Sequence, residues 1–103
     1  MIKITVPDKT PHRSEKCMPI DVSTSLLSDD VMFVDENGNE VNVNYLGLFA
    51  GTDGVVKSRM VGFSNATSLL LASGGWHTHP VSYIYKNGTD ASIAIFVRVS
   101  SHV

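Results

Sequence analysis

The sequence predicts an all-β fold, more specifically a small antiparallel β-sandwich or barrel built from hairpins. Three dipeptides, Asn37-Gly38, Asp53-Gly54 and Asn87-Gly88, tolerate the positive φ angles that tight hairpin turns require. Short runs of strand-forming residues flank each of them. Helical segments are scarce: residues 23–30 allow one short turn, and residues 65–72 hold too many β-branched and serine residues for a helix.

The first dipeptide is expected to join two strands. Residues 31–34 precede it, and residues 41–45 follow it with strict alternation of polar and apolar side chains. Because side chains of a strand point to opposite faces in turn, Val41, Val43 and Tyr45 are predicted to share a buried face.

The other two dipeptides predict two further hairpins. Residues 46–50 and 55–61 flank the second dipeptide, and residues 81–85 and 92–99 flank the third. Residues 93–97 are apolar at every position, which is typical of a strand covered on both faces. We therefore expect this segment to be a central strand, or a strand whose outer face is buried by another subunit.

The first twenty residues differ from the rest in composition. They contain three of the four prolines, Pro7, Pro11 and Pro19, together with charges of both signs. Proline lacks the N–H that a β-ladder needs and blocks a helix. The sequence therefore predicts an extended N-terminal arm over residues 1–20, suited to lie across a neighbouring subunit. A single β domain is expected over residues 21–103, since a chain of 103 residues has the usual length of one domain.

Charge and hydropathy exclude several classes of function. The net charge of −2 and the pI of about 6.0 give no basic surface for nucleic acid or for an anionic membrane. No apolar stretch approaches the ~20 residues that span a bilayer, and residues 1–6 do not resemble a signal peptide. We expect neither a nucleic-acid nor a membrane partner, and we expect synthesis in a cytoplasm. Only 17% of the residues are charged, which suits a surface covered by partner subunits.

The most distinctive local motif is Trp76-His77-Thr78-His79-Pro80. In a strand, His77 and His79 lie on the same face, where two imidazoles can bind one metal. Zinc takes three or four protein ligands, which one chain offers poorly. Three chains around an axis would supply six nitrogens for an axial iron or zinc, as in trimeric phage tail fibres. Otherwise the two histidines are expected to be surface or interface residues next to a proline-ended turn, without a cofactor, and Trp76 is expected to be a core or interface anchor.

No catalytic motif is present. The chain lacks a G-x-S-x-G nucleophile elbow, a phosphate-binding loop and a twelve-residue calcium loop. The sequence therefore predicts that the protein is not an enzyme. A small hydrolase or a sugar-binding module is the alternative from another functional class.

Three motifs follow one another within the last 55 or so residues: an aromatic-x-Gly-Thr-x-Gly turn after a strand, a Gly-to-Pro step, and a late Gly-Thr-x-Ala-x-Ile, found in residues 48–56, 74–81 and 88–93. In their order and spacing these motifs resemble the head-spike base proteins of gene transfer agents and related tailed phages. The step from Gly75 to Pro80 is one residue longer than in that family and contains both histidines. Residues 55–71 follow the family only loosely, and the proline-containing segment is not covered.

The resemblance implies a virion structural protein on the capsid surface. It would decorate or cement the capsid, or form the base of a head spike or fibre. Its implied partners are further copies of itself, as a trimer or pentamer, the major capsid protein, and a fibre protein. The predicted interface residues are Trp76, His77, His79, Pro7, Pro11 and Pro19. The alternative is a trimeric tail-spike or fibre-tip module in which His77 and His79 hold the metal.

Overall fold

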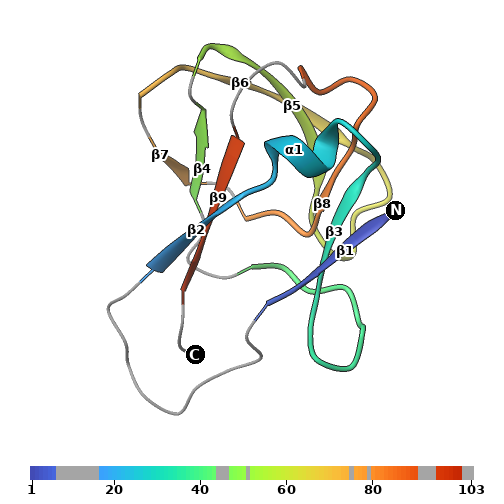
Figure 1. Cartoon of the computed structure of the whole chain (residues 1–103). Helices are drawn as coiled ribbons and strands as arrows, with labels where there is room; N and C mark the ends of the chain where they lie inside the picture. The colour runs from blue at the N-terminus through green and yellow to red at the C-terminus, as the bar shows by residue number, and fades with distance from the viewer. Residues whose placement is uncertain are drawn as a thin grey trace.

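The computed structural model of the chain describes residues 1–6, 17–43, 47–50, 52–74, 76–78, 80–90 and 95–100. These residues form two β-sheets and one short helix (Figure 1). The predicted all-β character is therefore confirmed. In the described ranges, no helix is long and apolar enough to cross a membrane.

Five strands make a mixed sheet, in the spatial order β1 (Ile2–Thr5), β3 (Val31–Val34), β8 (Tyr83–Ile84), β5 (Gly54–Arg59) and β6 (Thr67–Leu71). Four strands make an antiparallel sheet, in the order β2 (Cys17–Asp21), β9 (Ile95–Ser100), β4 (Gly47–Ala50) and β7 (Trp76–Thr78). The helix α1 (Ser23–Leu26) follows β2. It lies within the segment where the sequence allows one helical turn.

Both sheets contribute to one hydrophobic core. Phe33 and Ile84 of the five-stranded sheet are fully buried, and so are Ile95 and Val97 of the four-stranded sheet. Leu26 of α1 belongs to the same cluster. Since β9 lies between β2 and β4, the central strand predicted from the apolar run at residues 93–97 is confirmed.

The sequence predicted antiparallel sheets, but the five-stranded sheet contains one parallel pair. Strand β1 runs parallel to β3, with Ile2 paired to Val31 and Thr5 to Val34. Hairpins join only antiparallel neighbours. Here the chain leaves β1, forms β2 in the other sheet, passes through α1 and enters β3 in the direction of β1 (Figure 1).

The arm expected over residues 1–20 differs from the structure at both ends. Residues 2–5 form β1, where Ile2 and Ile4 pack against the core, and residues 17–21 form β2. Pro19 lies within β2, paired in register with Arg98. An edge strand tolerates proline because one side of its backbone faces no neighbouring strand. Pro7 and Pro11 lie outside the described residues.

At the first dipeptide the chain reverses direction as predicted, and the Asp35 N–H donates to the Asn39 carbonyl at 2.9 Å, which leaves residues 36–38 as the loop. Gly38 has a φ of +86°, and Val34 bridges to Glu40. The Asp35 carboxylate accepts hydrogen bonds from the backbone N–H groups of Asn37 and Asn39, at 2.8 and 2.9 Å. The loop is therefore held by its own aspartate, in the manner of an Asx turn.

After this loop, residues 41–43 form no regular strand, but the buried face predicted from their alternation is present. The Val41 N–H donates to the Phe33 carbonyl at 3.0 Å, and the Val43 N–H to the Val81 carbonyl at 3.2 Å. Val43 is buried, and Val41 packs against the core. Tyr45 lies outside the described residues.

The hairpins predicted at the other two dipeptides are wrong. Strands β4 and β5 on either side of Asp53-Gly54 belong to different sheets, and so do β8 and β9 around Asn87-Gly88. A turn dipeptide indicates where the chain bends and not which sheet receives the next strand.

After Gly88 the chain stays beside β5 before it crosses to the other sheet. The Lys57 N–H donates to the Thr89 hydroxyl at 2.9 Å, and the Asp90 N–H donates to the Val55 carbonyl at 2.9 Å. The Thr89 hydroxyl thus takes the place of a backbone carbonyl as the acceptor for β5. The Asn87-Gly88 turn therefore interrupts the chain that runs beside β5 from β8 to Asp90, and it does not close a hairpin.

Candidate functional site

In the described part of the chain, exposed large apolar side chains are more numerous on the β5–β6 hairpin than elsewhere. Its two strands pair from Gly54 opposite Leu71 to Ser58 opposite Thr67. Val61 and Phe63 in the connecting loop are 40% and 58% exposed, and Leu70 on β6 is 81% exposed. These are three of the five large apolar side chains that are exposed among the described residues.

Among the described residues, strand β6 pairs only with β5 and is therefore an outer edge of the five-stranded sheet. Its sequence, Thr-Ser-Leu-Leu-Leu, contains no charged residue and no proline. Natural sheets usually protect such edges with lysine, proline or a bulge, because unpaired backbone groups recruit other strands. Leu69 and Leu71 face the core, whereas Leu70 points to the outer face beside Val55. The hairpin thus combines an unprotected edge with an exposed leucine.

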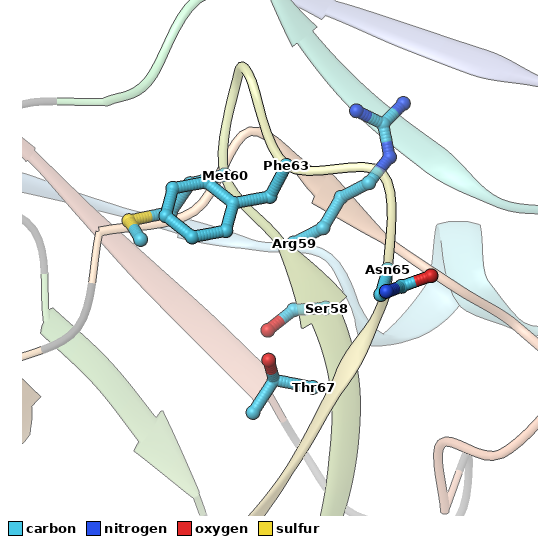
Figure 2. Close-up of a pocket in the computed structure, with 6 residues that line it drawn as sticks. All are labelled: Ser58, Arg59, Met60, Phe63, Asn65 and Thr67. Atoms are coloured by element: carbon cyan, nitrogen blue, oxygen red, sulfur yellow. The ribbon is translucent and has the colours of Figure 1, made fainter.

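A small cavity lies at the loop end of the hairpin. Figure 2 shows the hydroxyls of Ser58 and Thr67 directed to the same side of the hairpin, where Met60 and Phe63 also lie, while Arg59 and Asn65 point away. The cavity has a volume of about 60 Å³. Substrate pockets have about 300–1,000 Å³, and one water needs roughly 10–15 Å³. This cavity therefore suits a few waters or a short side chain, but not a substrate.

Ser58 gives the cavity its polar character. The side chain is fully buried, and its hydroxyl has no hydrogen-bond partner among the described residues. A buried hydroxyl without a partner costs about 1–3 kcal/mol. Because Ser58 faces the cavity, a water there would provide the missing partner.

Arg59, next to Ser58, is held on the opposite face of the hairpin. Its guanidinium donates to both oxygens of Glu40, at 2.8 and 3.3 Å, and stacks 4.5 Å from the ring centre of Tyr83. Burial acts to lower the pKa of Arg59, but attraction to Glu40 and hydrogen bonds with Tyr85 and Glu40 outweigh it and leave the pKa raised. The guanidinium is thus occupied by intramolecular partners.

Tyr83 connects this ion pair to the other side of the sheet. Its hydroxyl donates to Asp30 at 2.8 Å, and the other oxygen of Asp30 accepts from the Lys86 backbone N–H at 2.7 Å. Burial, followed by the hydrogen bond to Asp30, raises the pKa of Tyr83 to about 12. At neutral pH the phenol therefore stays protonated and serves as a structural donor.

The sequence-predicted site residues are only partly placed. Trp76 and His77 lie in β7, paired in register with Phe49 and Leu48. Their side chains, and His79 as a whole, lie outside the described part of the structure. Among the described residues, no three His, Cys, Asp or Glu side chains form a metal-binding group. The metal site and the contacts through these residues stay predictions.

The hairpin surface was not predicted from the sequence. The available signal was the run from Thr67 to Leu71, which contains neither the charge nor the proline that usually protects an edge strand. Exposure could not be inferred from it, because Leu70 and Leu71 are chemically identical, yet one is 81% and the other 3% exposed.

Comparison with known proteins adds no relative: no protein-family model, no curated protein and no solved structure matches the chain.

Proposed function

We propose that this protein is a structural subunit of a larger assembly, and specifically a phage virion protein that decorates or cements the capsid or forms the base of a head spike. The observation that supports an assembly role is the β5–β6 hairpin, where exposed apolar side chains and an unprotected sheet edge coincide.

The hairpin has the composition of a contact surface. Burying a large apolar side chain is favourable by about 1.5–3 kcal/mol, so a partner that covers Leu70 on the outer face, or Phe63 in the loop on the other face, would gain up to about that much from each. The polar groups around it are not arranged for chemistry. Arg59 is paired with Glu40, Tyr83 with Asp30, and the cavity at Ser58 is too small for a substrate.

The proposal includes the sandwich arrangement and the partners expected from the resemblance to head-spike base proteins. In this proposal the two sheets form a small sandwich, and copies of it associate as trimers or pentamers on the major capsid protein. Part of the resembling sequence, residues 48–56, leads directly into β5 of the hairpin. Trp76, His77 and His79, with the proline-containing segment near the N-terminus, form the second proposed contact.

The proposal is tested by binding to particles. Capsids assembled from the structural genes of the same genome are mixed with the full chain and separated by gradient sedimentation. We expect the protein to sediment with the particles at a fixed ratio per capsid subunit. Metal analysis of the same preparation separates decoration from the His77 and His79 trimer, which requires bound iron or zinc.

A matched pair of variants locates the contact. Phe63→Ser together with Leu70→Ser should reduce particle binding at least about tenfold, which corresponds to about 1.4 kcal/mol. Leu27→Ser changes another leucine that is 62% exposed, in the turn after α1, and should leave binding unchanged. A monomeric protein that remains at the top of the gradient would contradict an assembly role.

A further inference from the structure

We propose that β6 pairs with β6 of a second copy of this chain, antiparallel about a two-fold axis at Leu69, so that the two five-stranded sheets become one continuous sheet. This inference rests on the proposed function, because it takes the β5–β6 hairpin as an assembly surface and names its partner. The two-fold contact is separate from the contacts that build trimers or pentamers on the capsid and would join copies of neighbouring oligomers. An edge strand displays N–H and C=O groups on the side away from its neighbour, and another strand is the partner that satisfies them in order.

The register with the axis at Leu69, the middle residue of β6, pairs the whole strand and keeps its two faces distinct. A two-fold axis at Leu69 places Thr67 opposite Leu71 and Ser68 opposite Leu70 of the second copy. Facing residues are then an even number apart in sequence, so their side chains lie on the same face of the joined sheet. Their backbone groups also match, since alternate residues of each edge direct their N–H and C=O groups outward. The core-facing side, with Leu69 and Leu71, stays continuous across the axis.

Charge favours a second copy over another partner. Self-pairing brings each side chain of β6 close to those of an identical strand, which is unfavourable for any strand that carries a charge. Strand β6 carries none. The opposite edge of the same sheet, β1, contains the exposed Lys3 and is therefore less suited to self-pairing. A partner with a charged strand would find no opposite charge on β6.

Apolar contacts would add to the strand pairing. On the outer face, Leu70 of each copy lies diagonal to Leu70 of the other, within reach of leucine side chains. The loop with Val61 and Phe63 enters β6 at Thr67, and Thr67 lies opposite the end of β6 in the second copy. Both exposed side chains would therefore lie near the residues that follow Leu71 there. A five-residue strand pair is small for a stable interface, so the dissociation constant is expected on the order of micromolar.

The test uses facing charges, because the proposed register places residues 68 and 70 opposite each other. Ser68→Lys with Leu70→Lys puts like charges at both facing pairs. Ser68→Lys with Leu70→Glu puts opposite charges at the same positions and is the matched control. Sedimentation equilibrium of the full chains, over about 1–200 µM, measures the dimer, and circular dichroism checks the fold.

We expect the wild-type chain to dimerise, the lysine–lysine variant to dimerise at least about tenfold more weakly, and the lysine–glutamate variant to remain dimeric. A variant with glutamate at both positions should be weakened to a similar extent, and should form a tighter mixed dimer with the lysine–lysine variant. The mixed dimer tests the register a second time, because each lysine then faces a glutamate across the axis.

Several outcomes would overturn the inference. A wild-type chain that stays monomeric at about 200 µM, or two double variants that behave alike, excludes this pairing. Larger oligomers or particle binding that survive the lysine–lysine change would leave the assembly function standing and refute the edge contact. A monomer that binds particles, and loses this binding in the lysine–lysine variant, would show that β6 receives a strand from another protein. A dimer that never binds particles would refute the virion role alone.

Discussion

The two edges of the five-stranded sheet are built differently. At one edge, β1 places Lys3 and Thr5 in solvent and packs Ile2 and Ile4 on the core. At the other edge, β6 has no charge and exposes Leu70. A charged side chain on an edge discourages pairing with further strands. The comparison indicates that this sheet is protected against extension at β1 and open to it at β6.

Side-chain contacts connect the middle strands of the sheet to one another. Tyr83 on β8 donates to Asp30, which directly precedes β3, and its ring stacks under Arg59 of β5. Ser82 next to it donates to Glu40 at 2.6 Å, so the Arg59–Glu40 pair is joined to the same strand. Changes in the middle of the sheet should therefore affect stability, whereas changes at the edges should mainly affect association.

The largest effect is expected from Phe33→Ala in β3, which empties a fully buried position. Loss of a buried phenylalanine side chain costs about 3–5 kcal/mol through lost burial and the remaining cavity. Leu70→Ala, at the open edge, should cost less than about 0.5 kcal/mol. Denaturant unfolding at a concentration where the protein is monomeric measures both. Equal losses would show that Leu70 is buried in the monomer.

The next effect concerns the turn beside β5. Gly88 has a φ of +92°, and a Cβ there would lie 2.7 Å from Cδ of Lys57. Gly88→Ala should cost about 2 kcal/mol, from the left-handed backbone and from displacing Lys57, whose ammonium lies 5.9 Å from the ring centre of Tyr85. Gly38→Ala is the control, with a φ of +86° and no atom near its Cβ, and should cost about 1 kcal/mol. A difference near zero in thermal unfolding would mean that Lys57 moves freely.

A smaller effect is expected where the two halves of the sheet are linked. Tyr83→Phe removes the hydrogen bond to Asp30 and should cost about 1 kcal/mol at neutral pH. The pKa of Tyr83 is raised to about 12, above its ordinary value of 10.0, because burial and Asp30 favour the protonated phenol. The resulting stability is fully present below pH 10 and is lost as the pH rises through about 12.

Unfolding free energies between about pH 8 and 12 check this sign. The wild-type chain should lose stability over this range, and Tyr83→Phe should lose less. Tyr85→Phe is the matched control and should retain the decrease. If Tyr83→Phe declined as steeply as the wild-type chain, the alkaline loss would come from another group.

The smallest change in stability is expected from Lys3→Thr at the protected edge, within about 0.5 kcal/mol. Its effect should appear in association, because it removes the charge that distinguishes β1 from β6. We expect larger species in light scattering than for the wild-type chain at equal concentration. Lys86→Thr makes the same charge change away from both edges and should leave the mass distribution unchanged. If both variants behave alike, net charge and not edge protection controls association.

Much of the fold was predictable where the signal is local. The Asn37-Gly38 hairpin forms because Asp35 and Gly38 stabilise the loop without help from the rest of the chain. The position of β9 between two other strands was predictable from the run of apolar residues at 93–97. Strand β1 was also predictable, since Ile2 and Ile4 alternate with polar residues, but the prolines nearby suggested an arm instead.

Less of the candidate site was predictable. Apolar residues on an uncovered face or in a loop have the same sequence signature as core residues, so the exposure of Leu70 and Phe63 depends on which side of β6 the core covers and on where β5 ends. The buried Ser58 likewise lies at a core position of β5, next to Val56, and only the packing shows that its hydroxyl lacks a partner among the described residues.

The sequence by itself determined the all-β character, the positions of the bends, the low charge and the absence of known catalytic motifs. These properties depend on residue type and on neighbours a few positions apart. The tertiary structure decided which strands share a sheet, the parallel pairing of β1 with β3, and the choice of β6 as an edge. These features depend on contacts such as that between Tyr83 and Asp30, 53 residues apart, which form only when both sheets bury the same core.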